Sequence, residues 1–241
     1  MTAADSKNAR ASHDLAIDYG NLGDSLIDSD PAKAAEYHRA ALRIIDTLLE
    51  ASPGAFMFSR RQAHYLRGLG LAMRKQGNHQ TASKHLAQSL EILQKLSAQD
   101  PANLQIRSDL YVALNAMAGT LLDARNVAEA GDSYRQALTM AEATAASRPN
   151  DLSWQWRLAD SYSAFGRHYA AQASDPKSRL AERIANWRLA RDWRQKALGV
   201  WDEWPKHAVS NSFNLTRREQ AARAVAQCQT MLEKLGAEPQ P

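Results

Sequence analysis

The sequence predicts an all-α protein built from repeated helical hairpins, and two observations carry this prediction. Pro53, Pro101 and Pro149 recur at intervals of 48 residues, and the residues between them repeat in register. Within each half of the interval, apolar residues are spaced three, four and seven apart, which is the period of an amphipathic helix. Each interval is therefore expected to form one pair of helices.

Alignment of the intervals indicates which side chains pack between the paired helices. Small residues align with small ones and large residues with large ones, in the columns Gly70/Ala118/Gly166, Ala34/Ala82/Ala130 and His38/Leu86/Tyr134. Small residues let two helix backbones approach closely, and large residues fill the space around the contact. The residues expected to be buried for this reason are Leu69, Met73, Leu86, Leu90, Met117, Leu121 and Leu138.

The second repeat carries an order of large, small and turn residues at Leu66, Leu69, Gly70, Gly77, Ala82, Leu86, Ser89 and Pro101. This order resembles the tetratricopeptide repeat family. The resemblance covers about residues 9 to 204 and implies a right-handed α-solenoid that acts as a non-catalytic scaffold for protein–protein interaction. The interval departs from the family's usual period of about 34 residues. The second helix of each repeat is therefore expected to be longer.

A narrower resemblance comes from Asp100, Pro101, Asn103, Asp109 and Leu110 together with the segment from Trp201 to Leu232. These residues resemble the repeat regions that follow bacterial serine/threonine kinase domains. The resemblance implies the sensor or docking part of a larger signalling protein. Asp5, Asn8, Asp14 and Leu15 repeat part of the same pattern at an offset of 95. We therefore expect an earlier repeat or domain before this chain.

Four repeats are expected in chain order, at about residues 9–50, 54–97, 102–146 and 150–204, after a disordered tail at residues 1–8. Ser29-Asp30-Pro31 predicts the start of a helix, because Asp30 can cap it and Pro suits its first turn. Gly77-Asn78 and Arg125-Asn126 are the expected turns within the second and third repeats.

The fourth repeat is irregular. Ala190 and Arg194 match Ala130 and Tyr134 only at an offset of 60, so twelve residues have been added. They are expected to form about three extra turns at the start of a long helix from Lys177 to Trp204. A loop at 205–214, a capping helix at 215–236 and a tail at 237–241 follow. The capping helix is expected to begin with the Thr216-x-x-Glu219 capping box.

Composition limits the classes of function. The net charge of +4 is small for 241 residues and does not indicate a general nucleic-acid binder. No run approaches the roughly 18 apolar residues of a membrane span, and the first 13 residues are too polar for a secretory signal. The single Cys228 suits a reducing compartment. We therefore expect a cytoplasmic protein.

Catalysis is not expected. The seven His residues show no metal-ligand spacing, and none pairs with a carboxylate in a pattern that repeats. Gly68-x-Gly70 lacks the third glycine and the preceding strand of a dinucleotide-binding loop. Cys228 lies in the apolar stripe of the last expected helix, where a thiol usually acts as a small hydrophobe. No metal or cofactor is predicted.

The resemblance places the candidate site on the first helices of the repeats, which line a concave groove in the family. The residues carried over to that groove are His64, Arg67, Arg74, Lys75, Asn115 and Arg167, with Asp160 and Ser163 beside the last of them. Their charge favours an acidic or carboxylate-bearing protein segment through charge-assisted hydrogen bonds. They do not reproduce the family's carboxylate clamp of Lys and Asn residues. The other interpretation is an ordinary solvated helix face.

An alternative function is RNA or DNA binding by the fourth repeat. Seven basic residues lie between Lys177 and Lys196, and all six Trp residues follow residue 153. Basic side chains beside aromatic rings can hold a single strand. The competing interpretation is that the Trp residues fill uneven gaps in the core, with Trp156 as the exception because its columns hold Arg60 and Ser108.

Overall fold

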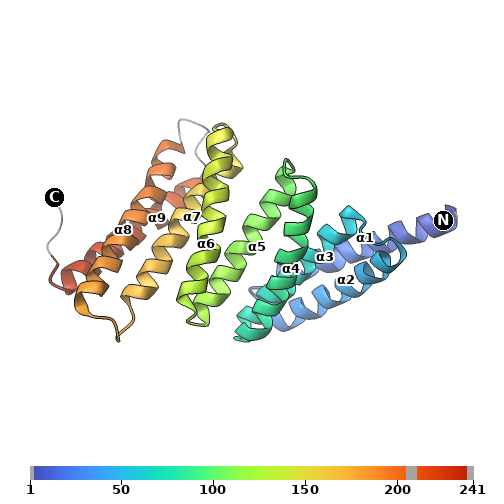
Figure 1. Cartoon of the computed structure of the whole chain (residues 1–241), viewed down its shortest axis with the longest axis horizontal. Coiled ribbons are helices and arrows are strands. Elements are labelled where there is room, and N and C mark those ends of the chain that lie inside the picture. The colour runs from blue at the N-terminus through green and yellow to red at the C-terminus, as the bar shows by residue number, and fades with distance from the viewer. Residues whose placement is uncertain (1–2, 205–210, 238–241) are drawn as a thin grey trace. The chain divides into compact units, whose positions relative to one another are not determined.

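The computed structural model describes residues 3–204 and 211–237, and every regular element within these ranges is an α-helix (Figure 1). The helices are α1 (Ala3–Leu26), α2 (Pro31–Ala51), α3 (Phe56–Lys75), α4 (His79–Gln99), α5 (Leu104–Asp123), α6 (Val127–Ser147), α7 (Leu152–Ala173), α8 (Leu180–Glu203) and α9 (Ser212–Lys234). The predicted all-α class is confirmed. The chain divides into two compact parts, unit 1 (residues 1–124) and unit 2 (residues 125–241).

The helix boundaries follow from local capping. Asp30 accepts a hydrogen bond from the backbone N–H of Lys33 at 3.0 Å, and Pro31 occupies the first turn of α2. Asn78 caps α4 by accepting from Thr81 N–H at 3.3 Å. Gly77 has φ of 78°, a left-handed conformation that glycine adopts without steric cost and that ends α3. The expected turn between the helices of the second repeat is therefore present.

In unit 1 each helix packs against the one before it, and the first helices of successive repeats, α1 with α3 and α3 with α5, also touch. We call the surface formed by α1, α3 and α5 the inner face of unit 1. Below it, Ala82 and Leu86 are fully buried. A Cβ atom on Gly70 would lie 2.7 Å from Leu86 Cγ, which explains the small residue in that column.

Five of the seven side chains that were expected to be buried are buried, namely Leu69, Met73, Leu86, Leu121 and Leu138. The prediction is wrong for Leu90 and Met117, which are only half-buried. Beside Leu90, the buried Ser89 donates a hydrogen bond to the carbonyl of Ala63 at 2.7 Å and takes the central contact with α3. Beside Met117, two buried alanines, Ala116 and Ala118, do the same for α5.

In unit 2, α7 packs on α6, α8 on α7 and α9 on α8. The long helix begins at Leu180 rather than Lys177, because the Asp175 carboxylate accepts from Lys177 N–H in a turn and Glu182 accepts from Arg179 N–H at the true start. Ala190 lies ten residues after the start of α8, whereas Ala130 lies three after the start of α6. About seven of the twelve added residues therefore lengthen α8, and the rest extend α7 and its turn.

The last helix covers α8 as expected but begins earlier than the predicted capping box. Asn211 and Asn214 exchange side-chain-to-backbone hydrogen bonds at 2.7 and 3.1 Å, and α9 starts at Ser212. The hydroxyl of Thr216 instead donates to the carbonyl of Ser212. Cys228 and Leu232 are buried against Trp187.

At the other end of the chain, α1 begins at Ala3 where a disordered tail was expected. Of the predicted loop, residues 205–210 lie outside the described part of the chain, as do residues 238–241 of the predicted tail.

Candidate functional site

The inner face of unit 1 is held by ion pairs between neighbouring first helices. Arg74 Nε on α3 lies 2.6 Å from Asp123 Oδ2 on α5. One further pair, Arg60 Nε with Asp109 Oδ2 at 2.6 Å, joins the same two helices. In each pair the partners are 49 residues apart in sequence. The two pairs are therefore equivalent rungs, about four helical turns apart along α3 and α5.

Pairs of the same kind join α3 to α1. Lys75 Nζ lies 2.5 Å from Asp28 Oδ1, and His64 Nε2 lies 3.1 Å from Asp24 Oδ2. The guanidinium of Arg67 donates to His64 Nδ1 at 3.0 Å, so the neutral imidazole carries its proton on Nε2 and donates it to Asp24. Burial lowers the pKa of Arg67.

The five predicted groove residues of unit 1 therefore lie on helices of the inner face, but each already has a partner. The four cationic or imidazole side chains, His64, Arg67, Arg74 and Lys75, are engaged as described above. Asn115 donates to the carbonyl of Tyr111 on its own helix at 2.9 Å. The charges on this face are balanced rather than free to attract an acidic partner.

His38 is a buried polar residue that the sequence-based site did not include. It is fully buried, in a cradle where a Cβ on Gly68 would lie 2.3 Å from the imidazole and one on Gly23 2.8 Å from it. Its nearest charged group is Asp24, whose Oδ1 lies 3.6 Å from Nε2. Burial lowers the pKa of His38 to about 4. A histidine in a column of large buried residues, facing glycines, was the available signal.

We expect His38 to make the stability of the protein depend on pH. An unfolded histidine titrates near pH 6.5, so the folded state resists protonation between about pH 6.5 and pH 4, where Asp24 raises the pKa and His64 and Arg67 lower it. The free energy of unfolding should fall by roughly 3 kcal/mol across that window. Urea unfolding at pH 7 and pH 4.5 measures the change.

The matched variant is His38→Leu, because Leu86 occupies the equivalent position in the next repeat. Burial also lowers the pKa values of His13, His85 and His168, and these residues contribute equally in both proteins. The difference between the two pH slopes therefore isolates His38. An identical slope in the variant would show that His38 is not the titrating group.

Unit 2 contains an enclosed pocket between α7, α8 and α9, which we call the Arg194 pocket. Its volume is about 250 Å³. The residues that line it are Trp156, Asp160, Ser163, Arg167, Arg194, Trp201, Arg217, Gln220, Ala221 and Ala224. The three groove positions predicted for the fourth repeat, Asp160, Ser163 and Arg167, thus come together in its wall. No hydrogen bond or ion pair occupies the Arg167 side chain within the described chain.

Arg194 forms the buried side of this pocket and is only 9% exposed. One of its terminal nitrogens, Nη1, donates to the carbonyl of Ala224 at 2.8 Å, to Gln227 Oε1 at 3.3 Å and to Cys228 Sγ at 3.2 Å. Burial raises the pKa of the Cys228 thiol, so this acceptor is neutral at pH 7. A Cβ on Gly166 would lie 2.5 Å from Arg194 Cγ, so only glycine admits the side chain here.

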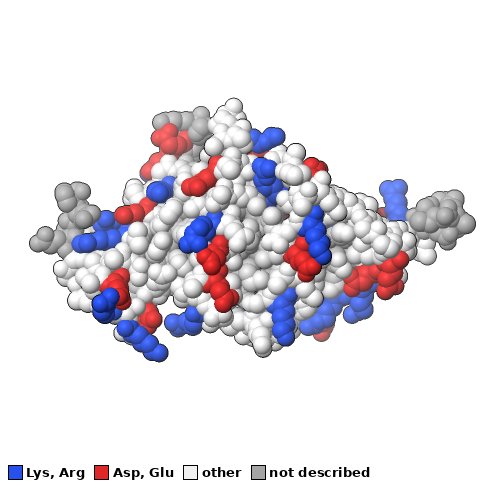
Figure 2. Space-filling model, viewed as in Figure 1, with Lys and Arg blue, Asp and Glu red and all other residues white. Residues whose placement is uncertain are grey.

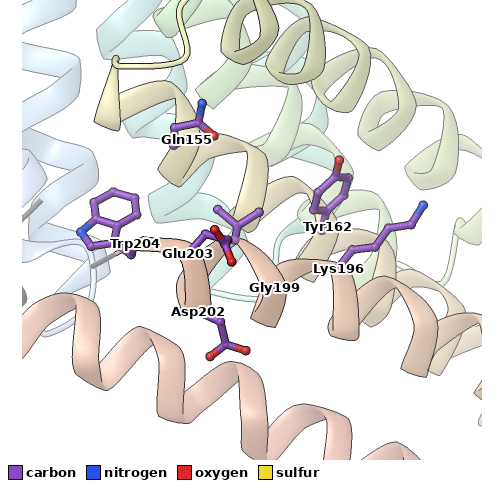
Figure 3. Close-up of a pocket in the computed structure, with 8 residues that line it drawn as sticks. Gln155, Tyr162, Lys196, Gly199, Asp202, Glu203 and Trp204 are labelled. Carbon is purple, nitrogen blue, oxygen red and sulfur yellow. The ribbon is translucent and has the colours of Figure 1, made fainter. Parts of the chain in front are cut away.

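A second, larger depression of about 760 Å³ lies against α7 and the end of α8 (Figure 3). Lys196 and Tyr162 lie on one side of it and Trp204 on the other, with Asp202 and Glu203 between them. Lys196 Nζ sits 4.2 Å from the ring centroid of Trp193, a cation–π contact. Asp202 pairs with Arg218 at 2.7 Å. The mixed charges give this depression no clear preference for one kind of ligand.

The basic run of the fourth repeat is largely occupied by contacts within the protein. Arg179 pairs with Glu182, Arg183 donates to the carbonyl of Ala173, and Arg194 is buried. Trp154, Trp187 and Trp201 are also buried, whereas Trp156 is half-buried in the wall of the Arg194 pocket. On the face in Figure 2, basic and acidic side chains are interspersed. The nucleic-acid alternative therefore gains no support.

Two searches of the described residues concern other classes of protein. They contain no cluster of three or more His, Cys, Asp and Glu side chains that could hold a metal ion. None of their helices is both long enough and apolar enough to cross a membrane.

Comparison with known proteins finds similar solved structures only at low identity. A kinesin light chain protein with nearly identical TPR-like repeats from Podosopora anserina is 18% identical, with a TM-score of 0.42, over 94% of this chain and 96% of that one. BtubC (BKLC) from P. vanneervenii is 14% identical, with a TM-score of 0.41, over 100% of this chain and 96% of that one. No protein-family model and no curated protein matches the sequence.

Proposed function

We propose that the chain is a non-catalytic helical-repeat scaffold that binds an extended segment of a partner protein along its first helices. The observation that carries this proposal is the set of ion pairs across the inner face of unit 1. These pairs tie α1, α3 and α5 together and hold polar groups in fixed positions. A binding surface that is already ordered loses less conformational entropy when a partner binds.

The proposed contact residues are those selected from the sequence, namely His64, Arg67, Arg74, Lys75, Asn115 and Arg167. The side chains of Arg74 and Asp123 remain 29% and 45% exposed, so both can also bond to a partner. A partly exposed ion pair is worth about 0–1 kcal/mol. A carboxylate that displaced Asp123 would therefore gain little. We propose that unit 1 binds a segment of mixed charge.

Reversing one ion pair tests this proposal without removing it. The double variant Arg74→Asp with Asp123→Arg keeps the pair and the net charge but inverts the polarity of the inner face between α3 and α5. We expect it to keep the helical content of the wild type. It should retain at most about a tenth of the partner protein that wild type captures from a cell lysate, by quantitative mass spectrometry.

The matched control is Glu91→Lys with Lys95→Glu, which inverts a pair of similar length on α4, a second helix. It should capture the wild-type amount. If both double variants capture as much as wild type, the partner does not bind the inner face. If both lose it equally, the effect is not specific to that face.

A further inference from the structure

We propose that the Arg194 pocket binds a single carboxylate side chain of the partner segment. This inference rests on the proposed function and assigns a chemical preference to unit 2. The geometry that points to it is a buried arginine, without an acidic partner in the described chain, that forms one wall of an enclosed pocket.

The charges around the pocket favour an anion. Arg194, Arg167 and Arg217 line it, against a single acid, Asp160. The acceptors that Arg194 has, a carbonyl, an amide oxygen and a neutral thiol, satisfy Nη1 but carry no negative charge. A buried charge without a counter-charge is unfavourable. An anion in the pocket would supply the missing counter-charge.

The shape and donors of the pocket favour a carboxylate on an amino-acid side chain. A volume of about 250 Å³ suits a group of that size rather than a cofactor. A guanidinium group presents two parallel N–H donors that match the two oxygens of a carboxylate. The indole N–H of Trp156, in the same wall, is buried with no acceptor in the described chain. The Asp160 carboxylate opposes a second negative charge, so a carboxylate is preferred over a doubly charged phosphate.

The other positive group on the rim has the position to reach a bound anion. Arg217 lies over the ring of Phe213, with its guanidinium carbon 5.2 Å from the centroid, and forms no ion pair in the described chain. Phe213 in turn packs edge-on against Trp156. Arg217 and Arg167 are therefore cations on opposite helices, α9 and α7, that can approach one ligand from two sides.

The test uses the full chain and four capped heptapeptides of glycine and serine whose central residue is glutamate, glutamine, phosphoserine or serine; a fifth, all-neutral peptide has a free C-terminal carboxylate. Binding is followed by NMR titration at a fixed ionic strength of about 0.15 M, since salt screens such contacts. We expect the glutamate peptide to bind at least tenfold tighter than the glutamine peptide and tighter than the phosphoserine one. The free C-terminus should bind as weakly as glutamine, because the proposal assigns a side chain.

The pocket variant is Arg167→Gln with Arg217→Gln, which leaves the buried Arg194 and its contacts with α9 intact. The matched control, Lys177→Gln with Arg188→Gln, removes the same charge from the same unit outside the pocket. The pocket variant should lose at least tenfold in affinity for the glutamate peptide, and the control should bind like wild type.

Equal binding of the glutamate and glutamine peptides, tighter binding of phosphoserine or of the free C-terminus, or equal losses in both variants would each overturn the inference. These outcomes are independent of the capture experiment on unit 1. A protein whose inner-face variant loses its partner, but which does not discriminate glutamate from glutamine, contradicts only the pocket. The converse result contradicts only the proposed function of the inner face.

Discussion

Removal of the last helix is expected to convert the protein into an aggregating species. A chain truncated after Trp204 loses Ala221, Cys228 and Leu232, which cover α8. Trp187 and Trp201, each 4% exposed in the complete chain, would become accessible. Arg194 would lose all three of its acceptors. An exposed apolar face of this kind drives self-association, and the terminal repeat of an array needs a polar outer cover.

Size-exclusion chromatography with light scattering and a thermal unfolding curve measure this outcome. The control is a truncation after Ala237, which keeps the whole of α9 and should remain monomeric with the melting temperature of the full chain. A monomeric truncation after Trp204 with an unchanged melting curve would contradict the role of α9 as a cover.

Leu86→Ala is expected to lower the free energy of unfolding by about 2–5 kcal/mol, the range for a fully buried leucine. Leu86 is completely buried and packs where Gly70 lets α3 and α4 approach each other. The control is Leu90→Ala on the same helix, which should cost clearly less because Leu90 is only half-buried. Chemical denaturation of both variants measures the difference. Equal losses would mean that the repeat column does not mark the centre of the core.

The sequence was sufficient for the fold because each repeat states the same packing rule independently. Gly70 and Ala82 meet in the second repeat, and the same small residues recur one interval later at Ala118 and Ala130. The rule fails where hydrogen bonding decides burial. Ser89 lies at the centre of its helix contact because its hydroxyl can bond to Ala63, and apolar spacing alone cannot show that. The start of α9 was missed for the same reason, since two asparagines cap it.

The candidate site was predictable in position but not in pairing. Periodicity placed Arg74 and Lys75 on a first helix, yet whether they are free depends on Asp123 and Asp28 on neighbouring helices. Adding one residue to the repeat interval gives the separation of 49 that joins Arg74 to Asp123, so the signal was present in the sequence.

The two buried polar residues could have been recognised in the same way. His38 and Arg194 each stand in a column otherwise filled by Leu86 and Tyr134, and each lies against a glycine. A polar side chain in such a column must be buried, and a buried polar side chain needs a partner. For His38 the neighbouring group is Asp24, and for Arg194 the acceptors on α9 leave its charge uncompensated.

The most direct test of the proposed scaffold function is the amount of partner captured by the inverted Arg74–Asp123 pair relative to the inverted Glu91–Lys95 pair. Both variants keep the net charge of the chain, and they differ in whether a first or a second helix is changed. The proposal predicts a ratio of about one tenth or less, with equal helical content in the two proteins. A ratio near one would contradict binding at the inner face of unit 1.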